Sequence, residues 1–248
     1  MLRVRKNLCL YRIIMPQPVL TKEGWFIFIR HLSSIGNKKS LSTFEEPQLM
    51  SIEPHIVDPK FTTLFRDTFG MDENEFEMLL SYFELKKVSK KEFYLKPGKV
   101  CRHKAYVNKG CLRNYVIDEL GHERILFFPI EDWWVADIDS YYSGEVGTNF
   151  IQAIEDCELL EISKENFQLL EKKIPKLSQW YAVKMTRRAT TANKRMEELK
   201  TMTPKDRYLD LLKNKPEIFQ RIPLQYIASY LNIEPQSLSR LRKQISGH

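Results

Sequence analysis

Side chains that can hydrogen-bond to the edges of nucleic-acid bases lie close together near the C-terminus. An arginine can donate to two acceptors of guanine, a glutamine can pair doubly with adenine, and a serine can bond to several bases. Lysine and arginine side chains beside them can neutralise backbone phosphates. The expected chemistry is recognition of double-stranded DNA, and the candidate contacts are Gln236, Ser237, Ser239, Arg240, Arg242 and Lys243.

Two short helices are expected to hold these side chains. Residues 224–231 form an amphipathic segment, and Asn232 follows as a residue that tolerates the left-handed turn conformation. Pro235 is acceptable in the first turn of the next helix. That second helix is expected to turn its apolar residues inward, namely Leu238, Leu241 and Ile245. The pattern predicts a helix-turn-helix over 223–245; the alternative is an ordinary helical hairpin with a solvated basic face.

Charge is distributed unevenly along the chain. The whole sequence has a formal net charge of +7 and a pI near 9.1. Residues 184–248 contain 14 Lys and Arg against 6 Asp and Glu, whereas residues 50–183 contain 17 against 23. A basic C-terminal module on an acidic body is typical of a nucleic-acid-binding domain fused to another domain.

The cysteines and histidines show none of the patterns that metal sites or catalytic centres require. Cys9, Cys101, Cys111 and Cys157 are far apart, without a Cys-x-x-Cys pair. His103 and His122 are isolated from each other and no His-x-His pair exists, so a cupin-like metalloenzyme remains only an alternative. We expect no enzyme activity, no metal and no cofactor. Scattered cysteines and the absence of an apolar run near the roughly 18 residues of a bilayer span favour a reduced, cytoplasmic protein without membrane contact.

The middle of the chain changes from helical to alternating periodicity. A short helix is expected over 72–82, and short strands over 92–95, 104–107, 111–117, 123–128, 150–154 and 159–162. Turn signals separate them at Pro97-Gly98, Lys109-Gly110 and 119–121. The fold class is therefore α+β, with an antiparallel β-roll followed by helices.

A long amphipathic helix is expected to begin at Pro175. Ser163 caps the shorter helix before it, and Thr203-Pro204 begins another helix that ends near Lys213. A helix of about 25 residues extends roughly 38 Å, longer than a small domain, and this favours dimerisation over packing on its own domain alone. The predicted dimer stripe consists of Leu177, Tyr181, Met185, Arg188, Ala192, Met196 and Leu199.

The expected organisation has four parts. Residues 1–49 lack sustained periodicity and are expected to be a poorly ordered extension that does not belong to the native protein, with Met50 as the natural start. Residues 50–173 form the β-roll, 174–202 the dimerisation helix and 203–248 the helix-turn-helix domain.

The C-terminal segments DRYLDLL, IASYL and PQSLSRLRK resemble the DNA-binding domain of Crp/Fnr-family regulators, in the form common among Bacteroidetes. The KPG and VNKGCLRNYVIDELGHE segments are similar to the family's cyclic-nucleotide-binding domain. The resemblance implies a cytoplasmic transcription regulator that binds a two-fold-related DNA site as a homodimer, and that contacts RNA polymerase if it activates transcription. A protein that uses the helix-turn-helix for an interaction other than DNA binding remains the alternative.

The resemblance breaks down at the effector site. Cyclic-nucleotide binders of the family hold the ribose with Gly-Glu and the phosphate with Arg followed by Ser or Thr, whereas Ala136-Asp137 and Gly147-Thr148 stand at those positions here. Without the arginine, a buried phosphate lacks its charge-assisted partner, so cyclic AMP is not expected as the effector. Any other effector is unidentified; the candidate pocket residues are Arg113, Arg124, Phe128 and Trp134, although an aromatic cluster in a roll more often forms a core than a ligand site.

Overall fold

The computed structural model describes residues 52–246. The predictions that residues 1–49 are a poorly ordered extension and that Met50 is the natural start lie outside these residues. Within the described range, no helix is both long enough and apolar enough to cross a membrane.

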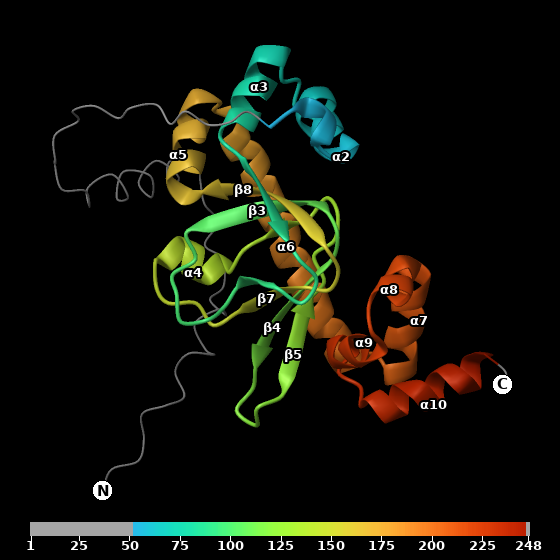
Figure 1. Ribbon diagram of the computed structural model, residues 1–248. Coiled ribbons are helices and arrows are strands. Elements are labelled where there is room, and N and C mark those ends of the chain that lie inside the picture. Colours follow the sequence, from blue (N-terminus) through green and yellow to red (C-terminus); the bar gives the residue numbers. More distant parts are fainter. Residues whose placement is uncertain (1–51, 247–248) are drawn as a thin grey trace, which may run out of the picture. The chain divides into compact units, whose positions relative to one another are not determined.

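Short helices precede a β-roll, and further helices follow it (Figure 1). The strands are β1 (Glu84–Val88), β2 (Phe93–Leu95), β3 (His103–Lys109), β4 (Leu112–Ile117), β5 (Glu123–Phe127), β6 (Trp134–Val135), β7 (Phe150–Ala153) and β8 (Cys157–Ser163). The helices are η1 (Pro54–Ile56), α2 (Pro59–Thr63), η2 (Leu64–Thr68), α3 (Glu73–Ser81), α4 (Ile138–Ser143), α5 (Lys164–Lys173), α6 (Lys176–Thr201), α7 (Pro204–Asn214), α8 (Pro216–Arg221), α9 (Leu224–Leu231) and α10 (Pro235–Ser246).

The roll consists of two four-stranded antiparallel sheets, ordered β1-β8-β3-β6 and β2-β7-β4-β5. Small and aliphatic side chains such as Ala105, Val107 and Leu159 fill the space between them. Gly110 permits the tight β3–β4 connection: its φ is +105°, and a Cβ there would lie 2.7 Å from the Cys157 sulfur. The predicted α+β class with an antiparallel roll is confirmed.

Local capping signals determine several helix ends, and those at Ser163 and Thr203 were predicted. Asp72 and Glu75 form a reciprocal capping box at the start of α3. The Ser163 side chain accepts from the Asn166 N–H at the start of α5, and the Thr203 side chain accepts from the Asp206 N–H at the start of α7. Each bond satisfies a backbone donor that a helix N-terminus leaves without an intrahelical partner.

Some elements were not predicted, and their sequences explain why. β1 has the sequence ELKKV and mostly exposed side chains, so it lacks a clear alternation. The α4 helix lies in an aromatic run after β6, where the pattern could not be told from a strand or loop. α8 is six residues long and begins directly after α7 at Pro216.

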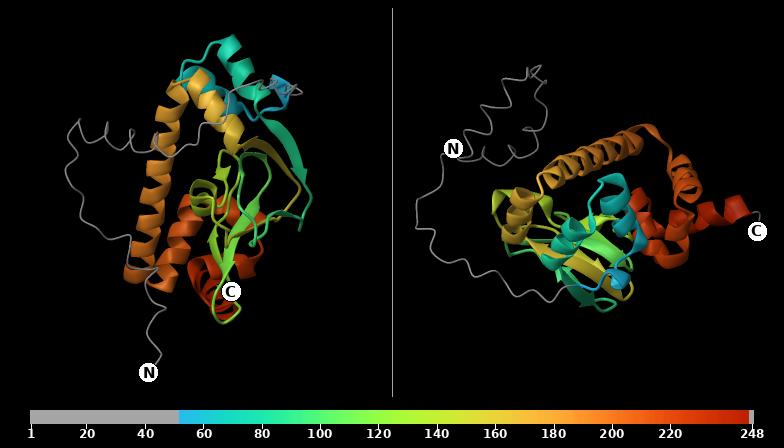
Figure 2. Two further views of the ribbon diagram at one scale, coloured as in Figure 1. Left: turned by 90° about the vertical axis from the view of Figure 1, so that its left-hand side faces the viewer. Right: turned by 90° about the horizontal axis from the view of Figure 1, so that it is seen from above.

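α6 is one unbroken helix of 26 residues between α5 and α7 (Figure 2). Its first turns pack into an aromatic core with α2, η2 and α3, through Leu177, Trp180 and Tyr181. Further along, Ala192 is exposed and Met196 is 58% exposed. The predicted dimer stripe is therefore corrected in its first part: Leu177 and Tyr181 are buried within their own chain, because the roll and the N-terminal helices already cover that end of α6.

Candidate nucleic-acid interface

α9 and α10 form a tight helix-turn-helix. Asn232 has φ +52° and ψ +51°, the left-handed conformation predicted for it. The Ile233 N–H donates to the Ala228 carbonyl at 2.9 Å and the Asn232 N–H donates to the Ser229 carbonyl at 3.1 Å, which together make a Schellman cap. Ala228 is fully buried, and its small side chain allows the two helices to approach. The predicted bounds of α9 agree with the structure.

α10 has one buried face and one exposed face. Leu238 is fully buried and Leu241 is half-buried against the cluster that α7, α8 and α9 also form. Ile245, in the last turn of α10, is 37% exposed and is not part of this cluster, so it is less buried than predicted. The predicted base and phosphate contacts are all exposed: Gln236, Ser237, Ser239, Arg240, Arg242 and Lys243. Gln236, Arg240 and Lys243 recur at spacings of four and three and share one side of the helix.

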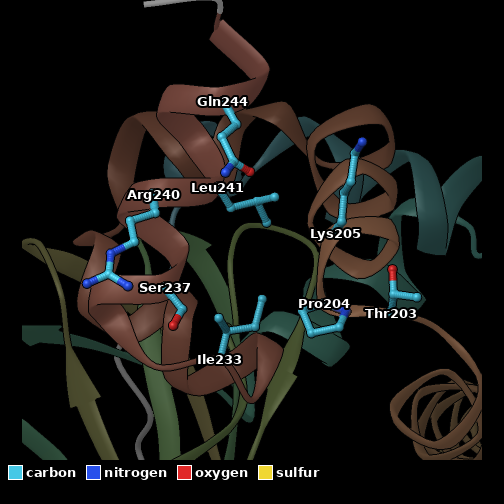
Figure 3. A pocket seen from close by; sticks show the side chains of 8 residues that line it. All are labelled: Thr203, Pro204, Lys205, Ile233, Ser237, Arg240, Leu241 and Gln244. Atoms are coloured by element: carbon cyan, nitrogen blue, oxygen red, sulfur yellow. The ribbon is translucent and has the colours of Figure 1, made fainter.

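A groove separates α10 from the first turn of α7 (Figure 3). It has a volume of about 360 Å³, and Ile233, Leu241 and Pro204 give it an apolar floor. Polar side chains stand along its two walls: Thr203 and Lys205 from the α7 side, and Ser237, Arg240 and Gln244 from α10. Thr203, Lys205 and Gln244 were not among the predicted contacts, because only the fold brings α7 beside α10.

Arg207 of α7 holds the helix-turn-helix in place. Its Nε donates to the Leu231 carbonyl at 3.0 Å, and its Nη1 donates to the Met202 carbonyl at 2.7 Å. One guanidinium thus satisfies a carbonyl at the end of α9 and another at the end of α6. No sequence motif marks this role, since the partners lie in different helices.

Ser229 and Arg195 join α9 to strand β5 of the roll. The Ser229 hydroxyl accepts from the Ile125 N–H at 3.1 Å and donates to the Glu123 carbonyl at 2.8 Å, so it pairs groups on the free edge of β5. Arg195 of α6 donates to the carbonyls of Leu126 and Tyr230, and its guanidinium lies 3.4 Å from the centre of the Tyr230 ring. Burial lowers the pKa of Arg195 below the usual arginine range.

Two of the residues predicted to line an effector pocket belong to this same junction. The Arg113 guanidinium lies between the rings of Tyr115 and Tyr226, 4.2 Å from each centre, and it also pairs with Glu123 and Gln152. Phe128 packs against Tyr230 with ring centres 5.3 Å apart.

The other two lie elsewhere, so the four predicted residues do not line one pocket. Arg124 is exposed and pairs with Asp118 at 2.7 Å. Hydrogen bonds, first from the His122 N–H and then from Arg124, lower the pKa of Asp118 to about 2. Trp134 packs with Trp180 and Tyr181 in the aromatic core of the N-terminal helices. The predicted pocket is therefore corrected. Phe128 and Trp134 belong to two different cores, and the aromatic content of the sequence does not show which residue belongs to which core.

Arg221 of α8 forms a second connection to the roll. It donates two hydrogen bonds to Glu131, at 2.8 and 2.9 Å, and one to Glu155. These bonds raise the pKa of Arg221. Burial acts to raise the pKa of Glu131, but hydrogen bonds from Arg221 and from backbone N–H groups outweigh it and lower that pKa.

The part of the chain that the structure describes contains no group of three or more His, Cys, Asp or Glu side chains placed to hold a metal ion. Cys101, Cys111 and Cys157 are buried free thiols, and burial raises the pKa of each.

Comparison with known proteins gives partial matches to one group of regulators. No family model matches the chain. Over 123 residues it is 24% identical to the cAMP-activated global transcriptional regulator CRP of Escherichia coli, a match that covers 50% of this chain and 59% of the relative. Over 114 residues it is 30% identical to the fumarate and nitrate reduction regulatory protein of Vibrio cholerae, covering 45% and 44%. The chain thus spans less than two thirds of the length of either relative.

A solved structure extends the likeness to both parts of the fold. The c-di-GMP responsive global regulator CLP of Xanthomonas campestris superposes with a TM-score of 0.59 at 19% identity, covering 71% of this chain and 92% of that one. In sequence over about half of the chain, and in fold, the chain is similar to Crp/Fnr-family regulators. As in Crp/Fnr proteins, a β-roll precedes a helical domain that carries a helix-turn-helix.

Proposed function

We propose that this protein is a transcription regulator of the Crp/Fnr type that binds DNA sequence-specifically and inserts α10 into the major groove. The observation that supports the proposal is the exposure of Gln236, Arg240 and Lys243 on one side of a helix whose other side is anchored by Leu238. An exposed α10 can enter a groove about 12 Å wide without any rearrangement of its own packing.

The groove beside α10 supports separate roles for side chains that contact the phosphate backbone and side chains that contact bases. Lys205 stands on the α7 wall of the groove, where it would meet a phosphate strand that passes the first turn of α7, and Arg240 on the α10 side is left to reach a base edge. Backbone contacts of this kind determine register, whereas side chains on α10 that reach base edges provide sequence preference. Thr203, Lys205 and Gln244 are therefore added to the proposed contacts.

The proposed active species is a homodimer formed through the exposed part of α6. Two recognition helices would then read a two-fold-related site whose half-sites lie about one helical turn, roughly 34 to 36 Å, apart. If the protein activates transcription, its proposed further partner is RNA polymerase. The residues described give no support to a catalytic role.

Selection of bound fragments from random duplex DNA with the purified full chain tests the proposal. The expected result is enrichment of one site with two-fold symmetry. Binding should weaken steeply with salt, in proportion to the phosphates contacted. If no sequence is enriched and binding to duplex DNA is absent at low salt, the basic face of α10 is merely solvated or serves another partner.

Two substitutions on α10 separate base reading from phosphate binding. We expect Arg240→Ala to cost about 1 to 3 kcal/mol at one base position and to relax the preference there, whereas Lys243→Ala should weaken binding to all sequences alike. Lys213→Ala, at the far end of α7 from the groove, removes the same charge as a control. Titrations against the selected site and against single-base variants measure the difference. Equal losses for Arg240→Ala on every sequence would contradict its assignment to base reading.

A further inference from the structure

The relative from Escherichia coli is named for activation by cyclic AMP, whereas the sequence of the present chain argues against this effector in the region of the roll between β6 and β7. This region contains Asp137, α4 and the loop 144–149. Its centre is the Asp137 carboxylate, in a residue only 3% exposed.

The Asp137 carboxylate accepts hydrogen bonds from three backbone N–H groups. Oδ1 accepts from Ser140 at 3.3 Å, within the first turn of α4. Oδ2 accepts from Thr148 and from Asn149, each at 3.2 Å, on the far side of the loop. The two donors from the loop converge on a single oxygen, as donors do around a bound anion.

Gly147 allows the carboxylate to come this close. A Cβ at position 147 would lie 2.5 Å from Asp137 Oδ2 and 3.2 Å from Asp137 Cγ. The space where a side chain of residue 147 would start is therefore filled by Asp137. No ligand atom can share that volume with the carboxylate.

Further hydrogen bonds hold the rest of the loop in place around the Asp137 carboxylate. The Ser140 hydroxyl accepts from the Cys101 N–H at 2.9 Å and donates to the Glu145 carbonyl at 2.5 Å. Gly147 exchanges backbone hydrogen bonds with residues 98 and 99, at 3.2 and 3.1 Å. The backbone donors that face the centre of the region are thus already paired within the chain.

Electrostatics also disfavour a second anion. Among the residues that the structure describes, no Lys, Arg or His nitrogen forms an ion pair with Asp137 within 4 Å. The charge of Asp137 does affect the pKa of Arg188 on α6. Burial lowers the pKa of Arg188, and the charges of Tyr181, Asp139 and Asp137 counteract this decrease. A nucleotide phosphate placed here would meet a buried carboxylate and no arginine of the loop, so cyclic AMP does not fit.

We propose that Asp137 is a built-in anion: its carboxylate occupies the backbone donors of Thr148 and Asn149 that an anionic effector would need, and it holds the α4–β7 loop closed without any effector. The roll of this protein is accordingly insensitive to cyclic nucleotides. The proposal concerns the roll alone and stands or falls independently of DNA binding.

Thermal unfolding of the full chain tests the proposal, with and without cyclic AMP, and with formate against chloride at equal ionic strength. The wild-type Tm should not move with millimolar cyclic AMP. Asp137→Ala leaves the buried N–H of Ser140 and the part-buried N–H groups of Thr148 and Asn149 without their acceptor, so its Tm should fall by about 5 °C or more. Formate, a free carboxylate, should restore part of this loss in Asp137→Ala and leave the wild type unchanged.

Asp139→Ala is the matched control, because it removes the same charge two residues away from an exposed position of α4. Asp137→Asn keeps the shape of the side chain and provides a folded variant if the alanine variant does not fold; it too should be less stable than Asp139→Ala. A rise of the wild-type Tm with cyclic AMP would overturn the proposal. So would equal stability of the Asp137 and Asp139 variants, or an equal formate response in wild type and Asp137→Ala.

Discussion

At the scale of single residues, the most unusual side chain is Lys104 of β3. It is 1% exposed, and its ammonium nitrogen has no hydrogen-bond partner among the described residues. Aromatic rings surround it instead: the nitrogen lies 2.9 Å from the ring centre of Phe167 and 3.4 Å from that of Tyr181, with Trp134 and Tyr141 farther out. The rings can stabilise an ammonium from several sides, but they replace only part of its hydration.

Burial of Lys104 makes stability depend on pH. Burial lowers its pKa from 10.5 to about 6, opposed by the charge of Glu171 on α5. The titratable groups facing it are Glu171, Tyr141 and Tyr181, since Trp134 and Phe167 do not ionise. Because the folded pKa is below the unfolded one, the unfolded chain binds the extra proton between these values. The free energy of unfolding therefore decreases as pH falls from the unfolded pKa toward the folded pKa, and this effect levels off below it.

Lys104→Met should remove this dependence while keeping the length of the side chain. We expect the variant to be more stable than wild type near pH 7, and the difference to shrink by roughly 1 kcal/mol per pH unit as pH rises toward about 10. Urea unfolding across that pH range measures it. Lys109→Met, at an exposed position of the same strand, is the control and should follow the wild type. A constant difference between Lys104→Met and wild type at all pH values would contradict burial of a titrating amine.

The residue scale is also where sequence analysis reached its limit. Caps at Asp72, Ser163 and Thr203 were predictable because each bond joins residues three apart. The cage of Lys104 and the bridge made by Arg195 join residues far apart in the chain. Residue type alone does not show whether an arginine among aromatics binds a ligand or another helix, so Arg113 was assigned to a pocket.

At the scale of elements, the approach of α9 to α10 depends on a small side chain. Ala228 has no exposed surface and lies one turn before the left-handed Asn232. Its carbonyl accepts from the Ile233 N–H, so any displacement of α9 at this point also disturbs the turn. The orientation of α10 consequently depends on a single methyl group.

Ala228→Leu should destabilise the chain by about 1 to 3 kcal/mol, because added methylenes cannot be accommodated in a closely packed interface without displacing one helix. The midpoint of urea unfolding measures the change. Gln225→Leu adds the same side chain at an exposed position of α9 and should change stability by about 0.5 kcal/mol or less. If the two variants proved equally stable, the helices would not be in the tight contact described.

The helices and strands that were predicted are those whose sequence signals lie close together in the chain. The helix-turn-helix was found from the sequence because its apolar spacing, its Asn232 turn and its Pro235 start all lie within 23 residues, 223–245. β1 was missed because it is stabilised by pairing with β8, more than 60 residues away, rather than by its own alternation. α6 was found as a helix, but which side faces its own roll depended on the N-terminal aromatic residues.

At the scale of the whole molecule, the roll and the helical domain are joined by polar as well as apolar contacts. Ser229 and Arg195 connect β5 to α9, and Arg221 connects α8 to Glu131 and Glu155. Around them Tyr115 and Phe128 of the roll pack in the same cluster as the core of the helical domain. A change in the roll therefore has direct contacts through which it can alter the position of α9 and α10.

The same scale decides how two chains would pair. Because the first turns of α6 pack against the rest of their own chain, a second copy can contact only the remaining turns of the helix. Met196 is an apolar side chain in those turns and is 58% exposed. We expect Met196→Glu to weaken the proposed dimer at least about tenfold, because a charge would be buried against a second copy. Val183→Glu is the control: Val183 is 52% exposed on the same helix and, at roughly 100° per residue, lies about 140° around it from Met196.

Sedimentation equilibrium of the full chain measures both variants over a range of concentrations. A dimer retained by Val183→Glu and lost by Met196→Glu would assign the contact to the stripe of Ala192 and Met196. Loss of DNA binding should accompany loss of the dimer, since one recognition helix alone makes about half of the base and phosphate contacts of a two-fold site. A wild-type monomer at concentrations where it binds the selected site with full affinity would rule out this assembly and leave α6 as a connector between the two domains.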